Sequence, residues 1–298
     1  MSIVIGVLEE GLIYAILALG VYITYKILDF PDLSVDGTFP LGAAVTAMLI
    51  LKEVHPAATL LLAFAAGALA GCVTGVIHVK LKVRDLLSGI IMMTALYSVN
   101  LRIAGKANLA IFTKETIFDN GFLDRVVPEG ARPFTVTLIL LAITLACKLI
   151  LDLYLNTRSG YLLRAVGDND VLVTSLAKDK GMVKVVGLAI ANGFVALAGC
   201  VYCQQKGFFE ISTGTGAIVI GLANVIIGTK VGARVFRKLP FIKATTLVIL
   251  GSLVYRACVA VAIAMGMAAS DLKLVTSALF LAILVASSLK GKKVPTYA

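Results

Sequence analysis

Long apolar segments recur along the whole chain and restrict its fold more than any other feature. They lie near residues 3–28, 39–51, 57–79, 86–103, 134–155, 183–203, 216–228, 242–264 and 274–289. A helix needs about 20 apolar residues to cross the hydrocarbon core of a bilayer. The ~10-residue alternation that marks membrane barrel strands does not occur in this sequence. We therefore predict an all-α, polytopic bundle of about eight or nine membrane-spanning helices, forming a single domain over residues 1–298.

The composition and the placement of charge agree with a membrane protein. Hydrophobic residues make up 59% of the chain and charged residues only 15%, whereas soluble domains carry about 45–50% and about 25%. The formal net charge is +10, and the basic residues concentrate near 80–84, 158–184, 230–243 and 290–293. Because Lys and Arg collect in cytoplasmic loops, this charge indicates a cytoplasmic C-terminus and an extracytoplasmic N-terminus rather than nucleic-acid binding.

Five cysteines are present, and we expect none of them to bind a metal. All lie in apolar runs, and the two histidines are far apart in the sequence. The spacing of Cys200 and Cys203 fits two zinc ligands, but a zinc site needs more ligands than that. We expect the cysteines to pack as small apolar residues, and no cofactor to bind to this chain.

Two of the apolar segments, 39–51 and 216–228, are too short to cross a bilayer alone. Polar, glycine-containing sequence precedes each of them, at 29–42 and 210–216. Paired short segments of this kind are typical of transporters with broken helices, whose free N-terminal N–H groups can face a solute. The alternative is two ordinary polar loops, each followed by a short helix.

Polar side chains in and near these segments are the candidates for a substrate pathway. Asp36 is the strongest of them, although its alternative role is the N-cap of a helix that begins near Phe39. Two asparagines farther along the chain fit a pathway and interhelical hydrogen bonding equally well. The predicted pathway residues are Asp32, Ser34, Asp36, Thr38, Asn192 and Asn224.

Charged residues within the spans require partners, because an unpaired charge at membrane depth is costly. Lys148 and Asp152 are four residues apart on one helix face, so we expect them to form an ion pair. Arg256 requires a carboxylate or carbonyl partner that the sequence does not identify.

The segment 156–182 is too polar to cross a membrane and predicts a short amphipathic helix. Asp168 or Asn169 is placed to cap its N-terminus, and Gly181 is placed to end it. Its apolar face contains Val171, Leu172 and Leu176. Such a helix either lies on the membrane surface or docks against a cytoplasmic partner.

This segment resembles the coupling region of permeases in ATP-binding cassette (ABC) importers of the branched-chain amino-acid type. The matching stretches are Arg164-Ala165-Val166-Gly167 and Ala177-Lys178-Asp179-Lys180-Gly181, and 187–199 is similar to the small-residue span that follows in that family. The run Asp29-Phe30-Pro31-Asp32 differs from the better-known members and resembles a divergent branch associated with tryptophan or tyrosine uptake.

The resemblance implies a transmembrane subunit that forms the path for a small solute, an amino acid and in this branch an aromatic one. It implies as partners an ABC ATPase, an extracytoplasmic solute-binding protein and a second permease copy, in the plasma membrane of a prokaryote. It assigns ATPase coupling to Arg164, Ala165, Gly167, Asp168, Val171, Leu172, Leu176 and Gly181. The sequence contains no G-x-x-x-x-G-K-[ST] loop, so the chain is expected not to be an enzyme, and ATP to bind to the partner subunit.

An ion-coupled secondary transporter with inverted repeats is the alternative reading. In that case the carboxylates of Asp29, Asp32 and Asp36 would bind the coupling ion or proton.

Overall fold

The computed structural model describes residues 2–121, 132–168, 179–232 and 243–265, with a few positions between 274 and 285. Within these ranges seven helical segments are long and apolar enough to cross a membrane, and α2 (Val35–Leu51) is a shorter apolar helix. This confirms the predicted all-α, polytopic bundle. The long segments contain α1 (Ser2–Tyr22) with η1 (Ile23–Ile27), α3 (Pro56–Val79), α4 (Asp85–Ala104), α6 (Arg132–Leu155), α9 (Lys180–Lys206), α10 (Ala217–Ile226) with η4 (Ile227–Gly232), and α12 (Ala244–Ala264).

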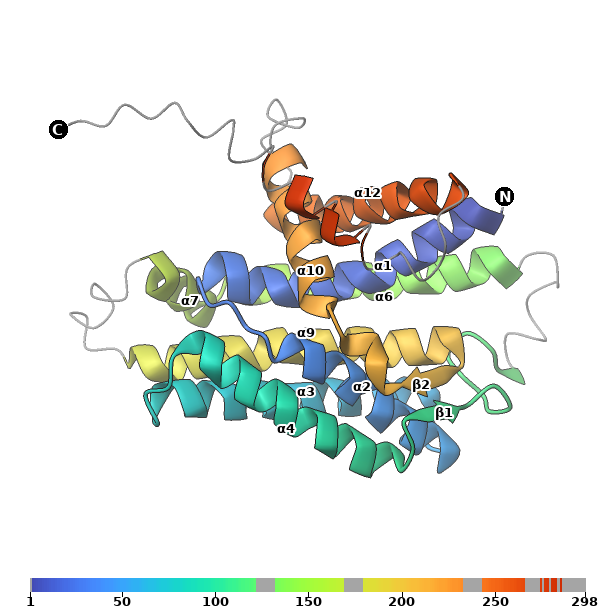
Figure 1. Ribbon diagram of the computed structural model, residues 1–298, viewed down its shortest axis with the longest axis horizontal. Coiled ribbons are helices and arrows are strands. Elements are labelled where there is room, and N and C mark those ends of the chain that lie inside the picture. The colour runs from blue at the N-terminus through green and yellow to red at the C-terminus, as the bar shows by residue number, and fades with distance from the viewer. Residues whose placement is uncertain are drawn as a thin grey trace.

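Two helices, α1 and α9, hold the bundle together. Helix α9 packs against α1, α2 and α3, while α1 also packs against α6, α10 and α12. Figure 1 shows α9 in the middle of the bundle, with α7 (Arg158–Asp168) at one end and the short strands β1 (Asn108–Ala110) and β2 (Phe208–Glu210) at the other. The two strands pair antiparallel. Fully buried side chains on α1, such as Ile13, Ile16 and Leu17, form part of the largest apolar core.

Small residues allow α2 to lie directly on α9. A Cβ added at Gly42 would lie 1.8 Å from the carbonyl oxygen of Ala196. In the same interface a Cβ added at Gly199 would lie 1.9 Å from the carbonyl oxygen of Phe39. Close backbone approach through small residues is the usual way that membrane helices associate, because lipid offers no hydrophobic drive for association.

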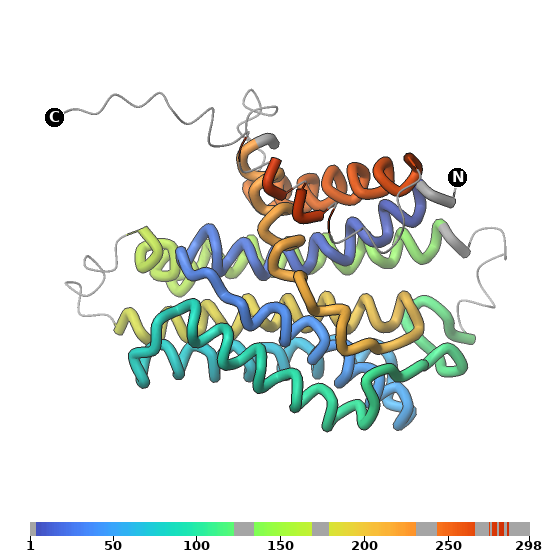
Figure 2. The backbone as a smooth tube through the Cα atoms, in the orientation of Figure 1, coloured from blue at the N-terminus to red at the C-terminus, as the bar shows by residue number. Residues whose placement is uncertain are grey.

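Both predicted interruptions are present, and Figure 2 shows the chain leaving the helical path at each. After η1, Asp29 adopts a φ of +51°, and helical structure resumes at Val35. Helix α2 thus begins four residues before the expected start near Phe39, with Pro40 inside it. After α9, the chain passes through β2 and the 3₁₀ turn η3 (Ile211–Gly214) before α10 begins.

The polar segment after α6 differs from the prediction. Helix α7 contains Asp168 as its last described residue, and the residues that Asp168 was predicted to cap lie outside the described part of the chain. Gly181 lies in the first turn of α9, where the Asp179 carboxylate accepts its N–H at 2.8 Å. Asp179 therefore caps α9, and the predicted stop at Gly181 is wrong. The predicted apolar face at Val171, Leu172 and Leu176, and the alternative cap Asn169, lie outside the described residues.

Substitution of Gly199 tests the packing of α2 on α9. We expect Gly199→Ala to destabilise the protein by about 1–3 kcal/mol, because the methyl group forces the two backbones apart. Gly6→Ala is the matched control, since nothing lies within 4 Å of a Cβ added at Gly6. Thermal unfolding in detergent measures both variants, and equal melting temperatures would contradict the assigned packing.

Candidate functional site

The carboxylate of Asp36 joins the two interrupted segments. Its Oδ2 accepts the backbone N–H of Gly216 at 2.9 Å, and its Oδ1 accepts that of Ile218 at 2.8 Å. The first N–H groups of a helix have no partner within the helix and carry partial positive charge. Asp36, 180 residues away from Gly216 in sequence, therefore caps α10. The alternative role as the N-cap of its own helix is wrong, because α2 begins at Val35 and Asp36 lies in its first turn.

A second polar cluster fixes the first interruption against α9. Asn192 donates from Nδ2 to Asp32 Oδ2 at 2.8 Å, and the Ser34 backbone N–H donates to Asp32 Oδ1 at 2.9 Å. The hydroxyl of Ser34 donates to Asn192 Oδ1 at 3.2 Å, while the hydroxyl of Thr38 donates to the Ser34 carbonyl at 3.0 Å. All four side chains are fully buried. In this structure their polar contacts fix the first interruption and the start of α2 against α9.

The remaining predicted pathway residue, Asn224, belongs to neither group. It is fully buried on α10, and its side-chain N and O atoms have no hydrogen-bond partner within the described part of the chain. Of the six predicted pathway residues, only Asp36 lies on the wall of a cavity described here.

That cavity, which we call the α2–α4 cavity, has a volume of about 380 Å³. It lies between the start of α2, the middle of α4 and the second interruption. Its lining consists of Asp36, Gly37, Pro40, Met93, Thr94, Tyr97, Asn100, Ile211, Ser212 and Thr215. The α4 residues Met93, Tyr97 and Asn100 recur at the spacing of one helix face. Tyr97 is 55% exposed, so the cavity is open on the α4 side.

At the α7 end of the bundle, α7 contacts the first interruption. A Cβ added at Gly167 would lie 1.7 Å from the carbonyl oxygen of Ile27, the last residue of η1. Leu163 and Val166 are buried, whereas Arg164 and Asp168 are exposed and Ala165 is half-buried. Helix α7 thus buries one face against the point where α1 ends, and it presents Arg164 and Asp168 outward.

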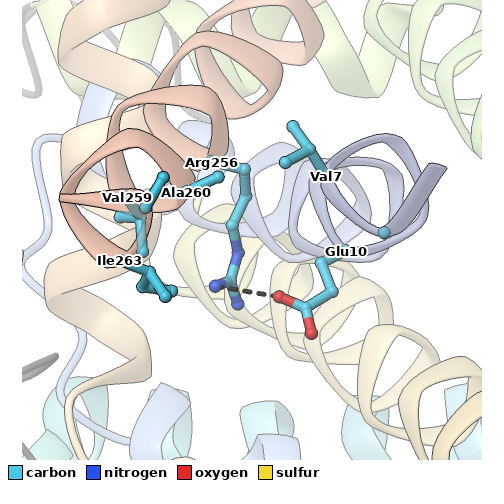
Figure 3. A pocket seen from close by; sticks show the side chains of 8 residues that line it. Val7, Glu10, Arg256, Val259, Ala260 and Ile263 are labelled. Carbon is cyan, nitrogen blue, oxygen red and sulfur yellow. Dashed lines mark ion pairs between the residues drawn. The ribbon is translucent and has the colours of Figure 1, made fainter. Parts of the chain in front are cut away.

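At the opposite end, an ion-pair cluster supplies the partner that Arg256 requires. Arg256 Nη1 lies 3.0 Å from Glu10 Oε2, and Lys206 Nζ lies 2.7 Å from Glu10 Oε1. The guanidinium also lies 4.2 Å above the ring of Tyr14, a cation–π contact. Figure 3 shows the Arg256–Glu10 pair beside a small cavity between α1 and α12. The cluster joins α1, α9 and α12 with two positive charges and one negative charge.

The predicted pair between Lys148 and Asp152 is also present, at 3.0 Å. Asp152 accepts a hydrogen bond from Thr245 at 2.7 Å and lies 3.3 Å from Lys243. This carboxylate connects α6 to the start of α12, which is a structural role.

Comparison with known proteins places this chain in a class of membrane permeases. Residues 3–287 match the family described as "Branched-chain amino acid transport system / permease component". The chain belongs to this family, which confirms the resemblance seen in the sequence.

Three relatives span much of the chain. A "Tyrosine transport system permease protein" of Clostridioides difficile is 42% identical over 97% of this chain and 92% of its own length. An uncharacterized protein of Rickettsia prowazekii is 33% identical over 92% and 94% of the two chains. The "Ribose import permease protein RbsC" of Escherichia coli K12 is 25% identical over 75% and 68%. No solved structure matches the chain.

Removal of the Glu10 charge tests the ion-pair cluster. We expect Glu10→Gln to cost about 1–2 kcal/mol, because two cations lose their counter-charge and the partly exposed cluster costs less to break than a fully buried pair. Glu53→Gln is the control, since Glu53 pairs with Lys114 on the surface with its side chain 78% exposed. Thermal unfolding in detergent compares the two, and a Glu10→Gln variant as stable as the control would contradict the cluster's role.

Proposed function

We propose that this chain is the membrane-spanning subunit of an ABC importer for an aromatic amino acid, with tyrosine as the first candidate. The observation that carries the proposal is the match over nearly the whole chain to the permease family and to a tyrosine permease. A separate ATPase drives the import, and an extracytoplasmic binding protein delivers the solute.

The α2–α4 cavity is the proposed part of the path within this chain. It lies at the second interruption and at the start of α2, which follows the first, and transporters with broken helices bind their solutes at such breaks. Its open side is formed by α4, on which Thr94 and Tyr97 are exposed. A second copy packed against this face would close the cavity, so the proposed assembly is a homodimer with the path between the copies.

Helix α7 and the segment that follows it are the proposed contact with the ATPase. The basic connections support a cytoplasmic location for this end of the bundle, with the C-terminus inside and the N-terminus outside. Closure of the ATPases would push on α7, and Gly167 would pass this movement to Ile27 and the first interruption. Val171, Leu172 and Leu176 would fill a groove on the ATPase. ATP would bind only to that partner.

The alternative, an ion-coupled secondary transporter, rests on the carboxylates at the first interruption. The three carboxylates have different surroundings in the structure. Asp29 is exposed, Asp32 is enclosed by Ser34 and Asn192, and Asp36 caps α10. No group of three or more His, Cys, Asp or Glu residues is placed to hold a metal ion within the described residues.

Tyrosine uptake by cells that express the chain with its ATPase and binding protein tests the proposal. We expect ATP-dependent uptake by the native chain and near-background uptake by Leu172→Asp/Leu176→Asp, because charged residues cannot fill an apolar groove. Leu172→Met/Leu176→Met keeps the apolar surface and serves as the matched control. Normal coupled uptake by the double Asp variant would overturn the assigned contact.

Coupling through α7 has its own test in Gly167→Val. The added side chain must displace Ile27, so we expect the assembled complex to hydrolyse ATP without importing tyrosine. Gly6→Val adds the same side chain where a Cβ meets nothing within 4 Å. ATP hydrolysis and tyrosine uptake are measured on the same proteoliposomes, which gives the number of ATP molecules hydrolysed per tyrosine imported. An unchanged number for Gly167→Val would contradict the proposed coupling through α7.

A further inference from the structure

The charge of the α2–α4 cavity is negative. Among the described residues that line it, Asp36 is the only acidic side chain, and none is Lys, Arg or His. Each carboxylate oxygen of Asp36 accepts one backbone N–H from the start of α10. A carboxylate oxygen has two lone pairs, so each oxygen can accept another donor. The helix terminus offsets about half a unit of charge, which leaves the cavity attractive to a cation.

Asn100 adds an acceptor that lacks a donor. Its side chain is fully buried, and Nδ2 donates to the carbonyl oxygen of Gly37 at 2.9 Å. This bond fixes which end of the amide faces Gly37, and Oδ1 is left without a partner in the described part of the chain. Buried polar atoms without partners are uncommon in native structures, and each requires an explanation. A ligand with several N–H donors would supply the missing bond.

The rest of the wall suits an aromatic body. Pro40, Met93 and Ile211 supply apolar surface, and the exposed ring of Tyr97 offers a face for stacking. The hydroxyls of Ser212 and Thr215 add further acceptors at the rim. The cavity therefore combines a carboxylate and a free amide oxygen with an aromatic and aliphatic wall.

We propose that the α2–α4 cavity is a binding site for an aromatic amine, in which Asp36 and Asn100 Oδ1 accept the N–H groups of a ligand ammonium. This deepens the proposed function and rests on it for the identity of the ligand, the α-ammonium of the transported amino acid. Within the described residues, the wall carries no basic side chain for a carboxylate. Recognition at this site thus depends on the ammonium, and tyramine should bind as well as tyrosine.

Protection of a single cysteine tests the site without transport. Thr94→Cys is made in a background in which half-buried Cys72 and exposed Cys258 are alanine. The labelling rate of this cysteine by a thiol reagent is then measured on the purified full chain in nanodiscs. We expect tyramine and tyrosine to slow labelling. We expect 4-hydroxyphenylpropionate, which lacks the ammonium, to have no effect. Equal protection by all three compounds, or protection by none, would overturn the proposal.

Variants then assign the two acceptors. Asp36→Asn keeps an oxygen that can cap α10 but removes the charge, so tyramine should protect about tenfold less well or worse, as for loss of a charge-assisted hydrogen bond. Asn100→Leu should also weaken protection. Asp85→Asn, at the start of the same helix α4 and outside the cavity, is the matched control. Unchanged protection in Asp36→Asn would overturn the assignment. Should that variant fail to fold, the comparison of ligands on the Thr94→Cys chain still decides.

The uptake assay separates this proposal from the proposed function. Tyramine protection without any tyrosine uptake would support the ammonium site and overturn the importer assignment for tyrosine. Tyrosine uptake without protection by any amine would overturn the site alone.

Discussion

The carboxylate of Asp36 caps the partly buried N-terminus of α10. The first N–H groups of a helix have no partner among the helix's own residues, so a contact from another segment stabilises a partly buried start. Gly216, which precedes α10 with a φ of +87°, has no side chain to do so. The start of α10, at the second interruption, is thus stabilised by α2, which carries Asp36. One carboxylate therefore connects α2 with the start of α10, two segments that are far apart in sequence.

Helix α9 places that carboxylate. Gly42 and Gly199 bring α2 against α9, and Asn192 of α9 holds Asp32 just before α2 begins. The α7 end of the same region is fixed by the contact of Gly167 with Ile27. A displacement of α7 would therefore act on η1 and, through residues 28–34, on Asp36 and α10. This chain of contacts connects the proposed ATPase surface to the proposed solute cavity.

The sequence predicted the features that depend on local composition and spacing. Apolar runs located the spans, a four-residue spacing predicted the pair between Lys148 and Asp152, and two short segments predicted the interruptions. Contacts across the fold were not predictable in this way. Nothing in one sequence shows that Glu10 faces Arg256, or that Asp36 caps a helix 180 residues away. The prediction that Gly181 ends a helix was wrong, because the carboxylate of Asp179, two residues earlier in sequence, caps the start of α9.

The proposed function makes this chain one part of an ATP-driven assembly. Purification of the tagged chain from its native membrane in mild detergent, with mass spectrometry of the proteins that accompany it, tests this claim most directly. We expect recovery of an ABC ATPase with the native chain. A chain that purifies alone and carries tyrosine into liposomes under an ion gradient would contradict it.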